Sequence, residues 1–121
     1  MVETSVLFDT NILIDYLNGI EKARTELERT ANRAISIVTW MEVMVGATLE
    51  DEAQIRAFLA TFRTHPITSE VAERAVDLRR QRKIKLPDAI IQATAEIAGR
   101  VLITRNSRDF SADNLGIRIP Y

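Results

Sequence analysis

The sequence contains no cysteine and only one histidine, His65, among its 121 residues. The lack of cysteine excludes disulfide scaffolds, thiolate zinc sites and cysteine nucleophiles. A zinc site of the usual nitrogen and sulfur composition has almost no ligands to draw on. Any metal would therefore be held by oxygen atoms, and we expect His65 to be structural or exposed.

Long apolar runs and an excess of one charge are also missing. No apolar segment is long enough to cross a bilayer, and the N-terminal residues lack the pattern of a signal peptide. Sixteen Lys and Arg residues against seventeen Asp and Glu residues leave a formal net charge of −1. We therefore predict a cytoplasmic protein without membrane association, in which only local clusters of positive charge bind polyanions.

The order of apolar patterns predicts the fold class. Short β-prone runs alternate with segments of helical spacing, and no repeat, low-complexity tract or linker divides residues 1–121. This alternation predicts a single α/β domain with a parallel central sheet and helices on both faces. The predicted strands are residues 5–8, 34–38, 101–104 and 117–119, with a short strand or connection at 66–67. The predicted helices begin after Asn11 and cover residues 21–29, 40–49 (capped by Thr39), 52–62, 69–83 and 89–98, the last closed by Gly99.

Three acidic residues lie near predicted strand ends or helix starts. Asp9 closes the first strand, Asp109 follows the strand at 101–104, and Asp88 comes after Pro87 where a helix opens. Active sites of open parallel sheets lie outside the carboxyl ends of the strands. Taken singly, each residue is better explained as a helix cap or a turn residue.

Glu42 is a fourth candidate, because it shares a helical stripe with Val38, Val45 and Leu49. This spacing would turn its carboxylate toward the apolar side, although a salt bridge or a place at the helix rim explains it too. Together the four acids would repel one another unless a cation offset their charge. Hard oxygen ligands select Mg²⁺ or Mn²⁺.

The same residues form a recognisable pattern along nearly the whole chain. It consists of Phe8-Asp9-Thr10-Asn11, Glu42, Leu86-Pro87-Asp88-Ala89, and Thr104-Arg105-Asn106 followed by Asp109-Phe110. In this order the motifs resemble PIN-domain nucleases, and more narrowly the VapC-type toxins of toxin–antitoxin pairs. The resemblance implies that Asp9, Glu42, Asp88 and Asp109 form a catalytic, metal-binding quartet supported by Asn11, Thr104 and Asn106. The family often has Asp at the position of Asn106.

The resemblance also implies an activity and partners. It implies a Mg²⁺- or Mn²⁺-dependent endoribonuclease that cleaves structured RNA, such as transfer or ribosomal RNA, and leaves 5′-phosphate and 3′-hydroxyl ends. It further implies a homodimer and a cognate antitoxin. Basic residues close to the acidic motifs are candidates for RNA binding, although a solvated surface explains any single one of them: Arg82, Lys83, Lys85, Arg105 and Arg108.

Three alternatives stay open. A phosphorylatable receiver domain has similar length and an acidic Mg²⁺ pocket, but it needs adjacent acids after the first strand, where this chain has Phe8 before Asp9. The fold can also serve as a binding module without chemistry. A nuclease of RNA processing, without a toxin role, would have the same motifs.

Overall fold

The computed structural model describes residues 5–110, 114 and 116–121. Within them, five parallel strands form one sheet in the order β3-β2-β1-β4-β5. The strands are β1 (Val6–Phe8), β2 (Arg33–Ser36), β3 (Arg63–His65), β4 (Val101–Ile103) and β5 (Ile117–Arg118). The predicted parallel sheet is confirmed.

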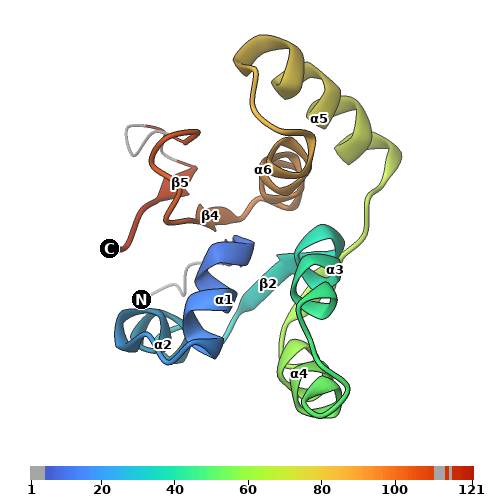
Figure 1. The fold of residues 1–121 in the computed structure, drawn as a ribbon. Helices are drawn as coiled ribbons and strands as arrows, with labels where there is room; N and C mark the ends of the chain where they lie inside the picture. The colour runs from blue at the N-terminus through green and yellow to red at the C-terminus, as the bar shows by residue number, and fades with distance from the viewer. Residues whose placement is uncertain (1–4, 111–113, 115) are drawn as a thin grey trace.

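Helices cover both faces of this sheet, as predicted. They are α1 (Thr10–Leu17), α2 (Glu21–Glu28), α3 (Ile37–Val45), α4 (Glu52–Leu59), α5 (Ser69–Arg82) and α6 (Leu86–Ala98). Figure 1 shows α5 and α6 on one side of the strands and α1, α2 and α4 on the other. Helix α3 contacts α1, α4 and α6, so it packs beside both layers.

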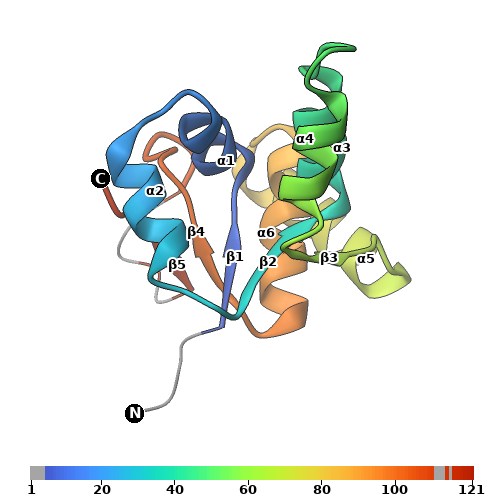
Figure 2. The same cartoon turned by 90° about the horizontal axis from the view of Figure 1, so that it is seen from below.

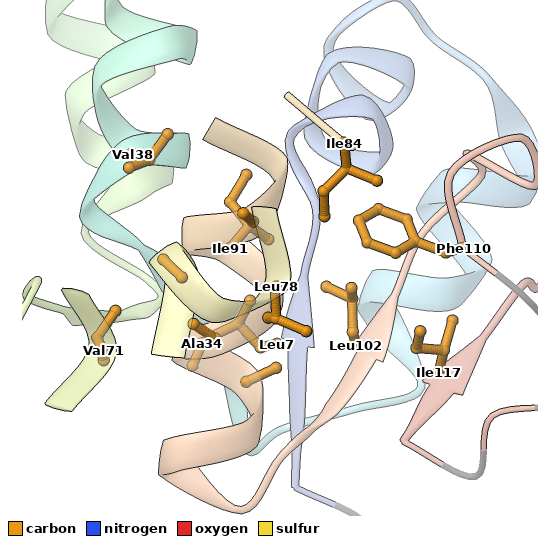
Figure 3. Packing of buried hydrophobic residues seen from close by; sticks show 14 residues of the cluster. Leu7, Ala34, Val38, Val71, Leu78, Ile84, Ile91, Leu102, Phe110 and Ile117 are labelled. Carbon is orange, nitrogen blue, oxygen red and sulfur yellow. The ribbon is translucent and has the colours of Figure 1, made fainter. Parts of the chain in front are cut away.

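Alternation along β1 supplies both hydrophobic cores. Leu7 packs under α5 and α6 with Leu78, Ile91 and Leu102, as Figure 3 shows. Phe8, on the opposite face, packs in the cluster under α1, α2 and α4. Burying each such side chain stabilises the fold by about 1.5–3 kcal/mol, so the sheet is held from both faces.

Local chemistry explains the limits of α6, a helix rich in buried alanines as predicted. Pro87 lies in the first turn, where the missing N–H is not needed, and Ala89, Ala93 and Ala95 let the helix approach α5 and the sheet closely. Gly99 adopts a left-handed φ of 67° and closes the helix, as predicted.

Several predicted boundaries are wrong at the second strand and the helix that follows it. Strand β2 ends at Ser36, whose side chain accepts a hydrogen bond from the Val38 N–H and caps α3. The β-branched run continues to Val38 and imitates a longer strand, so the predicted cap at Thr39 is wrong. Helix α3 correspondingly begins at Ile37 and ends at Val45, rather than covering residues 40–49.

The edge strand β3 was also misplaced by the sequence prediction. The strand is Arg63–His65, not residues 66–67, and α4 ends at Leu59 rather than at residue 62. Pro66 directly follows the strand, and proline has no N–H to donate to the ladder. The main chain therefore turns out of the sheet at this residue.

The strand order reverses direction at β1, the central strand of the sheet. From β1 the chain proceeds through β2 to β3 on one side, then crosses to β4 and β5 on the other. Ligand sites in such sheets lie at the carboxyl ends of the strands beside this change of direction. Asp9 and Thr104 directly follow the paired ends of β1 and β4. In the residues that the structure describes, we find no helix with the length and apolar character needed to cross a membrane.

Candidate active site

Asp9 is the buried centre of the acidic site. It follows β1 and caps α1, and its Oδ1 accepts a hydrogen bond from the Thr10 N–H at 2.7 Å. Its Oδ2 accepts from the Thr104 hydroxyl at 2.7 Å and from Asn11 Nδ2 at 3.3 Å. Only 4% of the residue is exposed, so the carboxylate has exchanged water for these three donors.

The surroundings of Asp9 favour its neutral form despite these hydrogen bonds. The pKa of the Asp9 carboxyl is raised to about 6, mainly by burial and also by the charges of Asp88 and Glu42, against the lowering effect of the hydrogen bonds from Thr104 and Thr10. A residue that served only as a helix cap would gain from a solvated, ionised carboxylate. The raised pKa therefore indicates a position that a cation would stabilise.

Glu42 reaches the site from α3 by a route that the sequence analysis did not find. The residue is exposed, and its supposed stripe partners Val45 and Leu49 are 86% and 96% exposed, so the prediction of an inward-facing stripe is wrong. Instead the Thr10 hydroxyl donates to Glu42 Oε1 at 2.6 Å. Because that proton is used, the Thr39 hydroxyl, 2.9 Å from Thr10 Oγ1, donates to Thr10. A buried threonine thus orders the Thr10 hydroxyl, which holds Glu42.

Asp88 occupies the first turn of α6, as predicted. It is half-buried, and burial raises the pKa of its carboxyl, with further contributions from the charges of Asp109 and Glu42 and an opposing one from Lys85. The helix dipole at this end favours a negative charge. Together with the effects on Asp9, these interactions link all four predicted acids electrostatically.

Asn106 orients Asp109 in the loop after β4. Its Nδ2 donates to Asp109 Oδ2 at 2.9 Å, and the Asp109 N–H donates to Asn106 Oδ1 at 3.2 Å. The Asn106 N–H in turn donates to the Thr104 hydroxyl at 3.0 Å, and Asn11 Oδ1 accepts from the Arg105 N–H at 3.2 Å. The three residues predicted to give polar support therefore connect Asp9 to Asp109 in the structure.

A pocket of about 630 Å³ opens beside the carboxyl ends of β1 and β4 and combines acidic with basic side chains. Asp88 and Asp109 line it, whereas Asp9 is buried and hydrogen-bonded to the lining residue Asn11. Four of the five predicted phosphate-binding residues line the same pocket: Lys83, Lys85, Arg105 and Arg108. A polyanion that entered would meet cations at the rim and carboxylates at the base.

The fifth basic residue, Arg82, is held by its own chain. Its guanidinium donates to Gln92 Oε1 at 2.7 Å and to the Asp109 carbonyl oxygen, and lies 5.7 Å from the centre of the Phe110 ring. These contacts fasten α5 to the loop that carries Asp109. A role in positioning this loop fits the observed contacts better than direct RNA binding.

Arg105 is positioned by two residues that the sequence analysis did not single out. Its guanidinium donates to both carboxylate oxygens of Asp15, at 2.6 and 3.2 Å. The Tyr121 hydroxyl also donates to Asp15, at 2.9 Å, and burial together with this bond raises the pKa of Tyr121 to about 12. No local pattern joins residues so far apart, so no sequence signal could have found this network.

The side chains present suit a hard divalent cation. Their donors are carboxylate, amide and hydroxyl oxygens, which Mg²⁺ and Mn²⁺ prefer. As they are placed, no three Asp, Glu or His side chains within residues 5–110, 114 and 116–121 form a group that could hold an ion. To share one cation, these carboxylates would have to move closer together.

The chain is similar to known proteins in both sequence and structure. The family model described as PIN domain matches residues 6–113. A relative named Ribonuclease VapC10, from Mycobacterium tuberculosis (strain CDC 1551 / Oshkosh), is 33% identical over 109 residues, which cover 84% of this chain and 82% of that protein. The residues that the family model matches span the positions of all four acids of the site.

Solved structures with a similar fold agree with this family match. A structure described as a toxin–antitoxin complex from Klebsiella pneumoniae contains a chain that is 50% identical, with a TM-score of 0.91 over 97% of this chain and 98% of that one. FitAcB from Neisseria gonorrhoeae shares the fold at 22% identity, with a TM-score of 0.80 over 95% of this chain and 97% of that one. The chain therefore belongs to the PIN-domain family, among relatives of the VapC type.

Proposed function

We propose that this protein is a divalent-metal-dependent endoribonuclease and the toxin of a toxin–antitoxin pair. The observation that carries the proposal is the buried Asp9 carboxyl, whose pKa is raised to about 6 with contributions from Asp88 and Glu42. Relatives named as a ribonuclease and as part of a toxin–antitoxin complex support the same activity. Membership of the PIN-domain family argues against the receiver alternative.

Asp9, Glu42, Asp88 and Asp109 would hold Mg²⁺ or Mn²⁺ in this proposal. When bound, the cation supplies positive charge that acidifies water and offsets the negative charge on the phosphodiester. The threonines and asparagines of the site keep the carboxylates oriented between turnovers. Thr104 and Asn11 restrain Asp9, Thr10 restrains Glu42, and Asn106 restrains Asp109.

The basic rim would bind the RNA backbone on either side of the cleaved bond. Lys83 and Lys85 follow α5, and Arg105 and Arg108 follow β4, so the phosphates would be contacted from two sides of the pocket. Asp15 fixes the direction of the Arg105 guanidinium. Held in this way, the phosphodiester undergoes in-line attack by water, which yields 5′-phosphate and 3′-hydroxyl ends.

The substrate and partners follow from the family resemblance. We propose that residues 1–121 act as one PIN-like nuclease domain on structured RNA, either transfer RNA or ribosomal RNA, in the cytoplasm. We also propose a homodimer and a cognate antitoxin whose tail occupies the groove over the acids. The exposed apolar side chains Met41, Val45 and Leu49 offer a surface that a protein partner could cover.

Cleavage of total RNA by the purified protein tests the activity. Wild type, Asp9→Asn and the exposed control Asp77→Asn are each incubated with Mg²⁺, Mn²⁺ or EDTA, and new 5′ ends are mapped. We expect discrete cuts in wild type and Asp77→Asn that require metal and disappear in Asp9→Asn. Cleavage that continues in EDTA, or full activity of Asp9→Asn, would refute the proposed site. An antitoxin gene beside the coding sequence separates a toxin from an RNA-processing nuclease.

A further inference from the structure

A second pocket lies at the far end of α6 from the acidic site. Its volume is about 220 Å³, and it is lined from β3, the start of α5, the end of α6 and the residue before β4. Figure 2 shows β3 beyond β2 at the edge of the sheet, on the way to α5. Helix α6 carries Asp88 at one end and Ala98 at the other, which places the two sites about 15 Å apart along the helix.

Two arginines line this pocket without an acidic partner among the residues that the structure describes. Neither Arg63 nor Arg100 takes part in an ion pair within the described part of the chain, whereas Arg74 and Arg118, for example, each pair with a glutamate. Burial lowers the pKa of Arg100, and the charge of Arg63 lowers it further. The two guanidinium groups are therefore close enough to repel each other, and an anion between them would relieve this repulsion.

Arg100 is held in place by backbone groups at the amino ends of the strands. Its Nη1 donates to the carbonyl oxygens of Val6 at 3.1 Å and Asn32 at 3.3 Å. All of its hydrogen bonds within the described residues leave from this one nitrogen. The guanidinium is thus oriented by the fold, while Nε and Nη2 keep donors for a ligand.

His65 adds a buried polar atom that has no partner in the described part of the chain. Its Nε2 is inaccessible to solvent and makes no hydrogen bond among the residues that the structure describes. Burial lowers the pKa of the imidazole, and the charges of Arg100 and Arg63 lower it as well. The ring is therefore neutral near pH 7. Arg63 and His65 are two residues apart on β3, which directs both side chains to the same face of the sheet. Buried polar atoms of this kind usually have a partner.

We propose that the pocket formed by Arg63, His65 and Arg100 binds a phosphate monoester. A monoester carries two negative charges near neutral pH and balances the two guanidinium groups, whereas a phosphodiester carries only one. Guanidinium groups match phosphate oxygens with paired hydrogen bonds. His65 Nε2 is covered in the absence of a ligand, and a turn of the ring toward the phosphate lets it donate a further bond. Pro66, Val71 and Ile97 supply an apolar wall for the ester group. This site is separate from the acidic pocket and does not depend on nuclease activity.

The single histidine makes the proposal directly measurable. His65 is the only imidazole in the chain, so its ring nitrogens give unambiguous signals in long-range ¹H–¹⁵N NMR spectra. Inorganic phosphate is titrated in EDTA at constant ionic strength into wild type, Arg63→Gln and the matched control Arg80→Gln on the exposed face of α5. Arg63 donates no side-chain hydrogen bond in the described residues, so Arg63→Gln should fold normally.

We expect a saturable shift of the His65 signals in wild type and in Arg80→Gln. Affinity should fall at least about tenfold in Arg63→Gln, as expected for loss of one charge-assisted contact. No saturable shift, or equal weakening in both variants, would overturn the proposal. Binding should persist in Asp9→Asn, so failure of the nuclease assignment would leave this result unchanged.

Further ligands distinguish the source of the phosphate. A nucleoside 5′-monophosphate and matched RNA oligonucleotides with a 5′-phosphate or a 5′-hydroxyl are titrated in the same way. Arg63-dependent preference for the phosphorylated oligonucleotide would identify an RNA end, and binding of the mononucleotide alone would identify a small molecule. Equal Arg63-dependent binding of both oligonucleotides would mean a phosphodiester contact and would refute the monoester.

Discussion

Replacement of Asp9 by asparagine should stabilise the metal-free protein. In the folded state burial raises the pKa of Asp9 from 3.8 to about 6, which corresponds to about 3 kcal/mol of destabilisation once the carboxyl is ionised. Asparagine has nearly the same shape and no charge. Its Oδ1 can still accept from the Thr10 N–H, and its Nδ2 can donate to the Thr104 hydroxyl.

Some of this gain is lost with one hydrogen bond. Asn11 Nδ2, 3.3 Å from Asp9 Oδ2, would face another amide N–H group and keep only its longer contact, 3.4 Å, with Thr104 Oγ1. The loss of a long hydrogen bond and the reorientation of Thr104 cost about 1–2 kcal/mol. We therefore expect Asp9→Asn to increase the free energy of unfolding by about 1–2 kcal/mol at about pH 8 in EDTA.

The stability difference between wild type and Asp9→Asn should depend on pH in a defined direction. Because the pKa of Asp9 is higher in the folded state than in the unfolded chain, the folded protein holds more protons between these two values. The destabilisation of wild type is therefore complete above about pH 6 and disappears as the pH falls toward about 4. The advantage of Asp9→Asn should shrink across this window.

Urea denaturation followed by circular dichroism measures both effects, with Asp77→Asn as the control for loss of an exposed carboxylate. A variant that is less stable than wild type at about pH 8 in EDTA, or an advantage independent of pH, would refute the electrostatic reasoning. Added Mn²⁺ should stabilise wild type by mass action and leave Asp9→Asn nearly unchanged. Equal stabilisation of both proteins would place the cation elsewhere.

Two further predictions concern orientation and binding. Thr10→Val removes the hydroxyl that donates to Glu42 and should lower kcat about tenfold with little change in KM. The control is Thr25→Val on the exposed face of α2. An unchanged kcat in Thr10→Val would show that Glu42 needs no such restraint. Lys85→Gln should reduce the slope of log Kd against log salt concentration for RNA by about one, measured by fluorescence anisotropy in EDTA, while Lys22→Gln on α2 should not. An identical slope for Lys85→Gln and wild type would exclude Lys85 from the RNA interface.

Asp9 and Glu42 show which features of the site the local sequence pattern can predict and which it cannot. The position of Asp9 after an apolar strand was sufficient to predict both its place at the sheet edge and its role as a helix cap. For Glu42 the helical stripe gave the wrong reason, because α3 ends at Val45 and leaves Val45 and Leu49 exposed. Glu42 nevertheless faces the site, through a hydroxyl group that comes from another helix.

The boundary between β2 and α3 shows why the local pattern failed there. Residues 35–38 are mostly β-branched and continue a strand pattern, yet the Ser36 side chain caps the Val38 N–H and starts the helix early. Propensity and capping compete at such a point, and packing decides between them. The helix starts three residues before its predicted first residue as a result.

The sequence by itself determined the parts of this protein that depend on neighbouring residues. Alternating and helical apolar patterns specified a parallel α/β fold, and acidic residues at strand ends specified an oxygen-rich pocket without thiolates or several imidazoles. Tertiary structure alone decided the strand order, the burial that raises the pKa of Asp9, and the contacts of Thr39 with Thr10 and of Tyr121 with Asp15. It also brought Arg63 and Arg100 together without an acidic partner among the described residues. The reason is physical: desolvation and charge interactions depend on distances in space, and residues far apart in the chain meet only when the sheet has formed.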